Sequence, residues 1–152
     1  MRIASKRLAK ELSDLRSGAL PTGCTILQAD DLQTWIFQIE TLGETVFKGE
    51  RFALRFRFDD QYPIESPEVV FVVSDGWKAP EASHVYSNGH LCLSILGDEW
   101  SPVMSVSSVL LSIQSMLASQ KQKERPPDND RYMKHAPLSP KDSRFVYHDD
   151  TI

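Results

Sequence analysis

The strict alternation of apolar residues and arginines along residues 51–58 is the feature that most constrains how this chain can fold. Phe52, Leu54, Phe56 and Phe58 fill the even positions, while three of the four odd positions hold arginine. Because successive side chains of a β-strand point to opposite faces, this pattern predicts a strand with one buried face and one solvated face. The fold is therefore expected to contain a sheet with one face exposed to solvent.

Two further segments predict strands that neighbour this one. Residues 35–40 alternate in the same way, and residues 69–73 form a short apolar run that is typical of a buried strand. Short connections join the three segments, which favours an antiparallel meander. The loop before the last strand contains two prolines, Pro63 and Pro67, which restrict its backbone.

Helices are predicted on both sides of the meander. Residues 3–16 carry leucines at helical spacing, and an apolar stripe indicates a second helix from about residue 105 to 120. Ser105 is a suitable N-cap for it. A short helix is expected near residues 128–135, and the rest of the C-terminal segment is expected to be loosely ordered. These features predict one α+β domain.

Composition and charge exclude several classes of protein. The chain has 152 residues, of which 41% are hydrophobic and 25% charged, as in an ordinary single globular domain. The net charge of −4 argues against nucleic-acid binding, which depends on an excess of Lys and Arg. No apolar run approaches the ~20 residues that span a membrane, and the N-terminus lacks the apolar block of a signal peptide. A cytoplasmic or nuclear protein with reduced Cys24 and Cys92 is expected.

Cys92 is the main candidate for chemistry. The sequence holds no phosphate-binding GxxxxGK[ST] loop, no HExxH and no histidine spacing typical of a metal site. Cys92 follows the turn dipeptide Asn88-Gly89, with His84 and His90 upstream, and a thiol beside an imidazole can act as a nucleophile. A cysteine between leucines is also often a small buried apolar residue. The local residues leave both interpretations open.

Four motifs, in matching order and spacing, resemble those of the ubiquitin-conjugating enzymes over nearly the whole chain. They are Lys6-Arg7-Leu8 in the first helix, a Tyr-Pro-x-x-x-Pro loop at 62–67, an Asn-Gly-x-x-Cys-Leu segment at 88–93 and Trp-Ser-Pro at 100–102. Residues 85–90, 125–129 and 147–151 are most similar to the W-type branch, which attaches ubiquitin to the α-amino group of substrate N-termini.

The resemblance implies the α+β ubiquitin-conjugating (UBC) fold. Its parts are an N-terminal helix, an antiparallel four-stranded meander, a long active-site loop, a central helix and a short, partly helical or loose C-terminal tail. The conjugating core is expected to cover residues 1–135. Residues 136–152 are expected to form a C-terminal tail that is partly disordered.

The implied activity is ubiquitin transfer. An activating enzyme uses ATP and passes ubiquitin to Cys92 as a thioester, which an amine then attacks, so this chain itself needs no cofactor. The expected partners are ubiquitin, the activating enzyme, RING or U-box ligases and protein substrates with flexible N-termini. A free α-amine, with a pKa near 7.7–8.0 against about 10.4 for lysine, is deprotonated about a few hundred times more often at neutral pH.

The resemblance also assigns residues to roles. The expected catalytic residues are Cys92, His84, Asn88, Asp128 and Asn129. The expected partner-binding residues are Lys6, Arg7, Pro63, Ile64, Ser101 and Pro102. The residues expected to contact a substrate N-terminus are Tyr147, His148, Asp149 and Asp150. Glu124 competes with Asp128 and Asn129 for the role of a polar gate that positions the amine.

The chain departs from the family at residues 82–84. Most members have His-Pro-Asn there, with an asparagine that supports the loop or stabilises the oxyanion, whereas this chain has Ala-Ser-His. His84 is a candidate for the missing role, and the alternative is an ordinary surface histidine. Other classes that stay open are a catalytically impaired UBC scaffold, transfer to lysine, conjugation of a ubiquitin-like protein and a thiol hydrolase.

Overall fold

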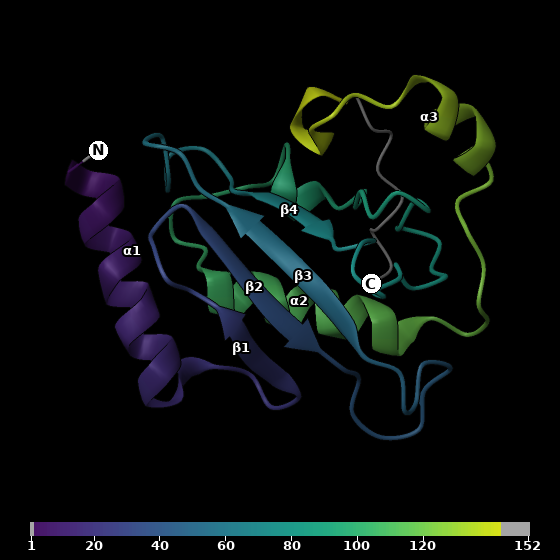
Figure 1. Cartoon of the computed structure of the whole chain (residues 1–152), viewed down its shortest axis with the longest axis horizontal. Helices are drawn as coiled ribbons and strands as arrows, with labels where there is room; N and C mark the ends of the chain where they lie inside the picture. Colours follow the sequence, from purple (N-terminus) through teal and green to yellow (C-terminus); the bar gives the residue numbers. More distant parts are fainter. Residues whose placement is uncertain (1, 144–152) are drawn as a thin grey trace.

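The computed structural model describes residues 2–143, in which a helix, a four-stranded sheet and further helices follow one another along the chain (Figure 1). The helical elements are α1 (Arg2–Asp14), the π-helical turn η1 (Leu15–Ala19), the 3₁₀ turn η2 (Ser94–Leu96), α2 (Val106–Ser119), α3 (Asn129–His135) and the 3₁₀ turn η3 (Pro140–Asp142). The strands are β1 (Cys24–Gln28), β2 (Thr34–Ile39), β3 (Phe52–Arg57) and β4 (Glu68–Phe71).

The sheet is an antiparallel meander with the strand order β1-β2-β3-β4. Trp35 pairs with Phe56 across β2 and β3, and Leu54 pairs with Phe71 across β3 and β4. The predicted α+β class and four-stranded meander are confirmed. β4 ends at Phe71, two residues earlier than the apolar run suggested, and a turn with a positive φ at Asp75 follows at residues 74–76.

The apolar face of the sheet packs against α2, which lies across it in Figure 1. Phe37, Leu54 and Phe56 from the sheet, and Val109 and Ile113 from α2, have no exposed surface. On the wet face, Arg55 and Arg57 of β3 lie 3.6 and 3.9 Å from the Glu68 carboxylate. The predicted N-cap is also confirmed, since the Ser105 hydroxyl accepts a hydrogen bond from the Ser108 amide.

A buried carboxylate joins α1 to the rest of the molecule. Glu11 accepts hydrogen bonds from the Tyr62 hydroxyl at 2.5 Å and from Arg7 Nε at 3.0 Å, while its other oxygen accepts from the Val106 amide at 2.7 Å. A buried charge is tolerated only when it is paired and hydrogen-bonded, and these three donors meet that need. Glu11 therefore ties together α1, the Tyr-Pro loop and the first turn of α2.

Candidate active site

A tight hairpin at residues 85–91 forms the centre of the candidate site. Val85 and Leu91 pair as an antiparallel bridge, and the Tyr86 amide donates to the His90 carbonyl at 2.9 Å. At the tip, the Asn88 side-chain oxygen accepts from the His90 amide at 3.0 Å. Asn88, predicted to be catalytic, therefore holds the turn through its own side chain.

Gly89 allows this hairpin to lie directly on β4. Its φ is +91°, and a Cβ added there would meet the Phe71 carbonyl oxygen at 2.1 Å. Any side chain would clash with backbone, so the position requires glycine. The Phe71 amide donates to the Gly89 carbonyl at 2.9 Å, and Val70 forms a bridge with His90. The hairpin is thereby fixed to the edge of the sheet.

Cys92 follows the hairpin, and its amide donates to the His84 carbonyl at 2.8 Å. Only 7% of the residue is exposed, which by itself would fit a small buried apolar residue. Cys92 nevertheless lies outside the main hydrophobic cluster. Burial raises the pKa of both Tyr86 and Tyr132, and the nearby Cys92 adds to this in each case. Cys24, in contrast, lies in the core, where burial raises its thiol pKa to about 11.

His84 is half-buried and lines a depression of about 610 Å³ beside the end of α2. The other lining residues come from its neighbour Ser83 and from residues 119–124. Glu124 is among them, and its amide donates to the Glu81 carbonyl at 3.1 Å. The structure therefore brings Glu124 to the side of the loop that carries His84.

Asp128 and Asn129 lie at the start of α3 and hold the hairpin from the other side. The Tyr86 hydroxyl donates to the Asp128 carboxylate at 3.1 Å. Asn129 accepts from the Ser87 amide at 2.9 Å and donates to the Ser87 hydroxyl at 3.2 Å. Burial, followed by the charge of Asp128, raises the pKa of the Tyr86 phenol. Both predicted gate residues thus contact the hairpin that precedes Cys92.

Sequence reasoning missed the aromatic cluster that covers this hairpin. The rings of Tyr86 and Tyr132 stack with centroids 3.9 Å apart. The Tyr132 hydroxyl lies 2.6 Å from His90 Nδ1 and 2.8 Å from the Ser143 hydroxyl. Burial lowers the pKa of His90, which also hydrogen-bonds to the backbone of Leu138. The residues in each ring contact stand more than 40 positions apart, so no local spacing signals this cluster.

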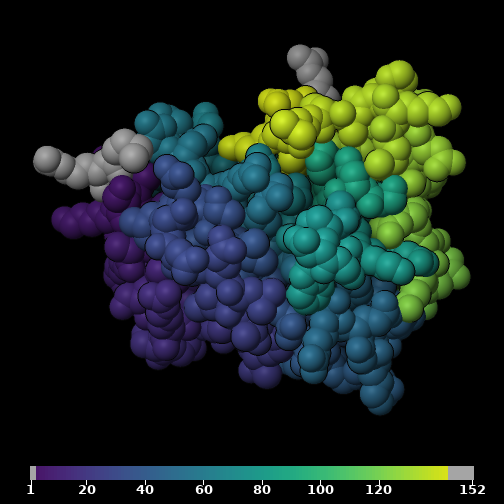
Figure 2. Space-filling model, viewed as in Figure 1, coloured from purple at the N-terminus to yellow at the C-terminus, as the bar shows by residue number. Residues whose placement is uncertain are grey.

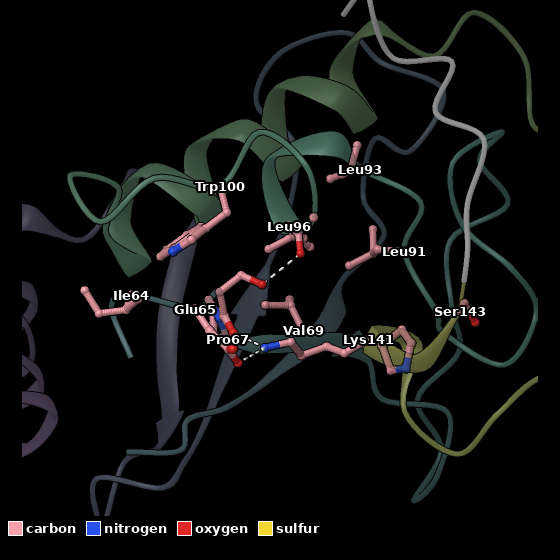
Figure 3. A pocket seen from close by; sticks show the side chains of 13 residues that line it. Ile64, Glu65, Pro67, Val69, Leu91, Leu93, Leu96, Trp100, Lys141 and Ser143 are labelled. Carbon is pink, nitrogen blue, oxygen red and sulfur yellow. Dashed lines mark hydrogen bonds and ion pairs between the residues drawn. The ribbon is translucent and has the colours of Figure 1, made fainter. Parts of the chain in front are cut away.

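The cluster places the C-terminal segment beside the active-site loop. In Figure 2 the yellow surface of this segment abuts the teal surface of the loop. The Ser139 hydroxyl donates to Glu68 at 3.0 Å, and Lys141 Nζ donates to the Ser66 carbonyl at 2.6 Å. The segment borders a pocket of about 410 Å³. Figure 3 shows Leu93, Trp100 and Lys141 among the side chains that line it. Tyr147, His148, Asp149 and Asp150 lie outside the described residues.

The predicted partner-binding residues gather at one end of the molecule. Arg7 donates to the carbonyls of Pro102 and Met104 at 2.9 and 2.6 Å, so α1 contacts the segment after Trp100. Trp100 Nε1 donates to the Pro63 carbonyl at 2.9 Å. Within this end of the molecule, the side chains differ in exposure: those of Lys6, Ile64 and Pro102 are exposed, Arg7 and Ser101 are intermediate, and Pro63 is buried.

Residues 2–143 provide neither a metal-binding cluster nor a membrane span. Nowhere in that range do three or more His, Cys, Asp or Glu side chains come together as metal ligands could. None of the helices in the same range is long and apolar enough to cross a bilayer. The candidate site is centred on Cys92, whose amide is bonded to the loop that carries His84.

Comparison with known proteins identifies this arrangement. Residues 7–142 match the ubiquitin-conjugating enzyme family. The chain is 48% identical over 149 residues to the probable ubiquitin-conjugating enzyme E2 W-A of Danio rerio, and the alignment covers 96% of each protein. It is 44% identical over 152 residues to the ubiquitin-conjugating enzyme E2 W of Caenorhabditis elegans, covering 98% of this chain and 97% of that protein.

The fold leads to the same family. The crystal structure of the ubiquitin-conjugating enzyme E2 UbcA1 from Agrocybe aegerita is similar, with a TM-score of 0.90 and 56% sequence identity. That similarity covers 91% of this chain and 99% of the other. The resemblance drawn from the four motifs is confirmed, and so is the UBC fold that it implied. The chain belongs to the ubiquitin-conjugating enzymes, which carry ubiquitin as a cysteine thioester and pass it to an amine.

Proposed function

We propose that Cys92 is the residue that accepts ubiquitin, and that the enzyme transfers it to the α-amino group of substrate N-termini. The observation that carries this proposal is the placement of Cys92 directly after the docked hairpin, with its amide bonded to the His84 carbonyl. In the transfer step, an unprotonated amine attacks the thioester carbonyl. A C–N bond forms, the C–S bond breaks, Cys92 leaves as thiolate and the proton of the amine passes to solvent.

The choice of α-amines follows from the protonation state of the nucleophile. An α-amine near pKa 7.7–8.0 is about 10–20% deprotonated at pH 7, whereas lysine near 10.4 is deprotonated in only about one molecule in a few thousand. An enzyme whose nucleophile is an α-amine therefore needs less help from its own residues in removing the proton of that amine. Such an enzyme can function with Ala-Ser-His at residues 82–84, where most of the family has His-Pro-Asn.

His84 supports the oxyanion or the loop in this scheme. Its carbonyl holds the amide of Cys92, so the residue is linked to the nucleophile by one hydrogen bond. Asp128, held by the Tyr86 hydroxyl, is the gate carboxylate that receives the incoming amine, and Glu124 on the opposite side of the loop is its competitor. Asn129 contributes by fixing the turn at Ser87.

No cofactor takes part in the scheme on this chain, because the activating enzyme uses the ATP. The ligases are of the RING or U-box type and bind the end of the molecule formed by α1, the Tyr-Pro loop and residues 100–104. Reducing conditions in the cytoplasm and nucleus keep Cys92 available as a thiol.

The first test of the proposal is a charging assay. Incubation with activating enzyme, ATP and ubiquitin is expected to give a single adduct that reductant removes. A Cys92→Ser variant is expected to give an adduct that resists reductant, since an oxyester replaces the thioester, and a Cys24→Ser control is expected to charge normally. A thioester that persists in Cys92→Ser would refute the assignment of Cys92.

A His84→Ala variant tests the role of the histidine. Because charging requires only the thiol, the variant is expected to charge, and its discharge to a peptide α-amine is expected to fall by about tenfold or more. The measurement is single-turnover loss of the purified thioester, with a His135→Ala variant as the control on an exposed histidine of α3. Discharge at the wild-type rate would show that His84 is an ordinary surface residue.

The acidic end of the chain supplies the third test. We propose that Tyr147, His148, Asp149 and Asp150 contact the positively charged N-terminus of a flexible substrate. Deletion of residues 144–152 is then expected to raise the peptide concentration needed for half-maximal discharge, while charging is unchanged. Full-length and truncated thioesters are compared over a range of peptide concentrations, and identical curves would contradict the proposal.

A further inference from the structure

We infer that residues 120–125, which follow α2, position the active-site loop, and that Arg125 is the principal positioning residue. The inference rests on the proposed role of Cys92 and adds a residue that acts on it from outside the hairpin. The loop concerned is residues 79–85, which ends at the base of the hairpin and contains His84.

The Arg125 guanidinium binds three backbone carbonyls of this loop. Nη1 donates to Pro80 and, at 3.3 Å, to Val85, while Nη2 donates to Ala79 at 3.0 Å. Arg125 is half-buried, and burial lowers the pKa of its guanidinium. Its planar fork can meet several carbonyls at once, which a lysine ammonium on a flexible stem cannot reproduce.

Two further contacts run between the same segments. The Gln120 side-chain oxygen accepts from both the amide and the hydroxyl of Ser83 at 3.3 Å. The Glu124 amide donates to the Glu81 carbonyl at 3.1 Å. Residues 120–125 thus bind the loop at positions on both sides of Ala82, and the Gln120 contact at Ser83 lies next to His84.

The loop needs this support because it lacks regular structure and the usual proline. Residues 79–84 belong to no helix or strand. Ser83 stands where most of the family has proline, whose ring would fix φ without outside help. The His84 carbonyl, in turn, holds the Cys92 amide. Residues 120–125 therefore hold the backbone of residues 79–85, and that backbone in turn binds Cys92 through the His84 carbonyl.

The chemical consequence is that the geometry of the loop at residues 79–85, which binds Cys92, depends on Arg125. Residues that orient metal ligands from outside the coordination sphere contribute about 10- to 100-fold, and we expect Arg125 to contribute at the lower end of that range. The contribution should fall on the transfer step, where the thioester carbonyl must present one face to the amine. Peptide affinity should be unaffected, since Arg125 is proposed to touch neither substrate nor the reacting atoms.

The test compares Arg125→Ala with Arg125→Lys and with Arg16→Ala, a control on an exposed arginine of η1. Each purified thioester is discharged to an unstructured peptide with a free α-amine. Arg125→Ala is expected to lower the maximal rate by about tenfold, with the half-saturating peptide concentration changed by less than about twofold. Arg125→Lys is expected to remain impaired, because one ammonium cannot replace the three contacts.

Two readouts separate positioning from general destabilisation. Added methylguanidinium, at non-denaturing concentrations, is expected to restore part of the rate in Arg125→Ala and to leave Arg16→Ala unchanged. Amide exchange at Cys92 and Val85 is expected to accelerate in Arg125→Ala, while amides within α2 keep wild-type protection. Gln120→Ala is a milder second variant with the same expected direction in both readouts.

Discharge of Arg125→Ala at the wild-type rate, with wild-type exchange at Cys92, would overturn the inference. So would a uniform loss of protection that includes α2 and that methylguanidinium does not reverse. Failure of the proposed function can be distinguished from failure of this inference, because the amide-exchange experiment requires no ubiquitin. If the wild-type enzyme discharges to lysine alone, the same comparison of rates is made with a lysine peptide.

Discussion

The close approach of Gly89 to the Phe71 carbonyl is the contact on which the geometry of the active site depends. It brings the 85–91 hairpin against β4, where the Phe71 amide donates to the Gly89 carbonyl and Val70 forms a bridge with His90. A buried backbone group must find a partner, and the hairpin provides partners that the edge of β4 would otherwise lack. The register of this contact decides where Cys92 emerges and which way Tyr86 faces.

The parts of the site then attach to the docked hairpin from two directions. Residues 120–125 hold the loop that leads into it, and α3 holds its tip through Asp128 and Asn129. The C-terminal segment is fixed by the His90 and Tyr132 contact and by the polar bonds to Glu68 and Ser66. Glu11 organises the opposite end of the molecule in a comparable way, around one buried carboxylate. Separate polar networks thus support the segment around Cys92 and the predicted partner surface.

Patterns that act within a few residues were the ones the sequence could reveal. The alternation along β3, the Ser105 cap and the helix at residues 129–135 depend on neighbouring positions, and all three are confirmed. β1 was implied only by the family resemblance, because its pairing with β2 is irregular between Ile26 and Gln28 and its burial does not alternate. The strand therefore lacks the period of two that marks β3.

Long-range contacts of the site had no such signal. Cys92, His84 and the Asn-Gly turn were found because they lie within nine residues of one another. The Arg125 contacts join positions 40 to 46 residues apart, and they end on backbone carbonyls, which every residue possesses. The ring contacts of Tyr132 span similar distances along the chain. Recognising these residues required the fold, since side-chain identity alone does not specify a backbone partner.

The most direct test of the account is a competition between two amines for one thioester. Enzyme charged at Cys92 is mixed at pH 7 with equal amounts of two peptides, one with a free N-terminus and no lysine, the other with an acetylated N-terminus and one lysine. Mass spectrometry of the products is predicted to show α-linked ubiquitin in excess by about 100-fold or more, following the difference in free amine. Equal products, or a preference for the lysine peptide, would contradict the account.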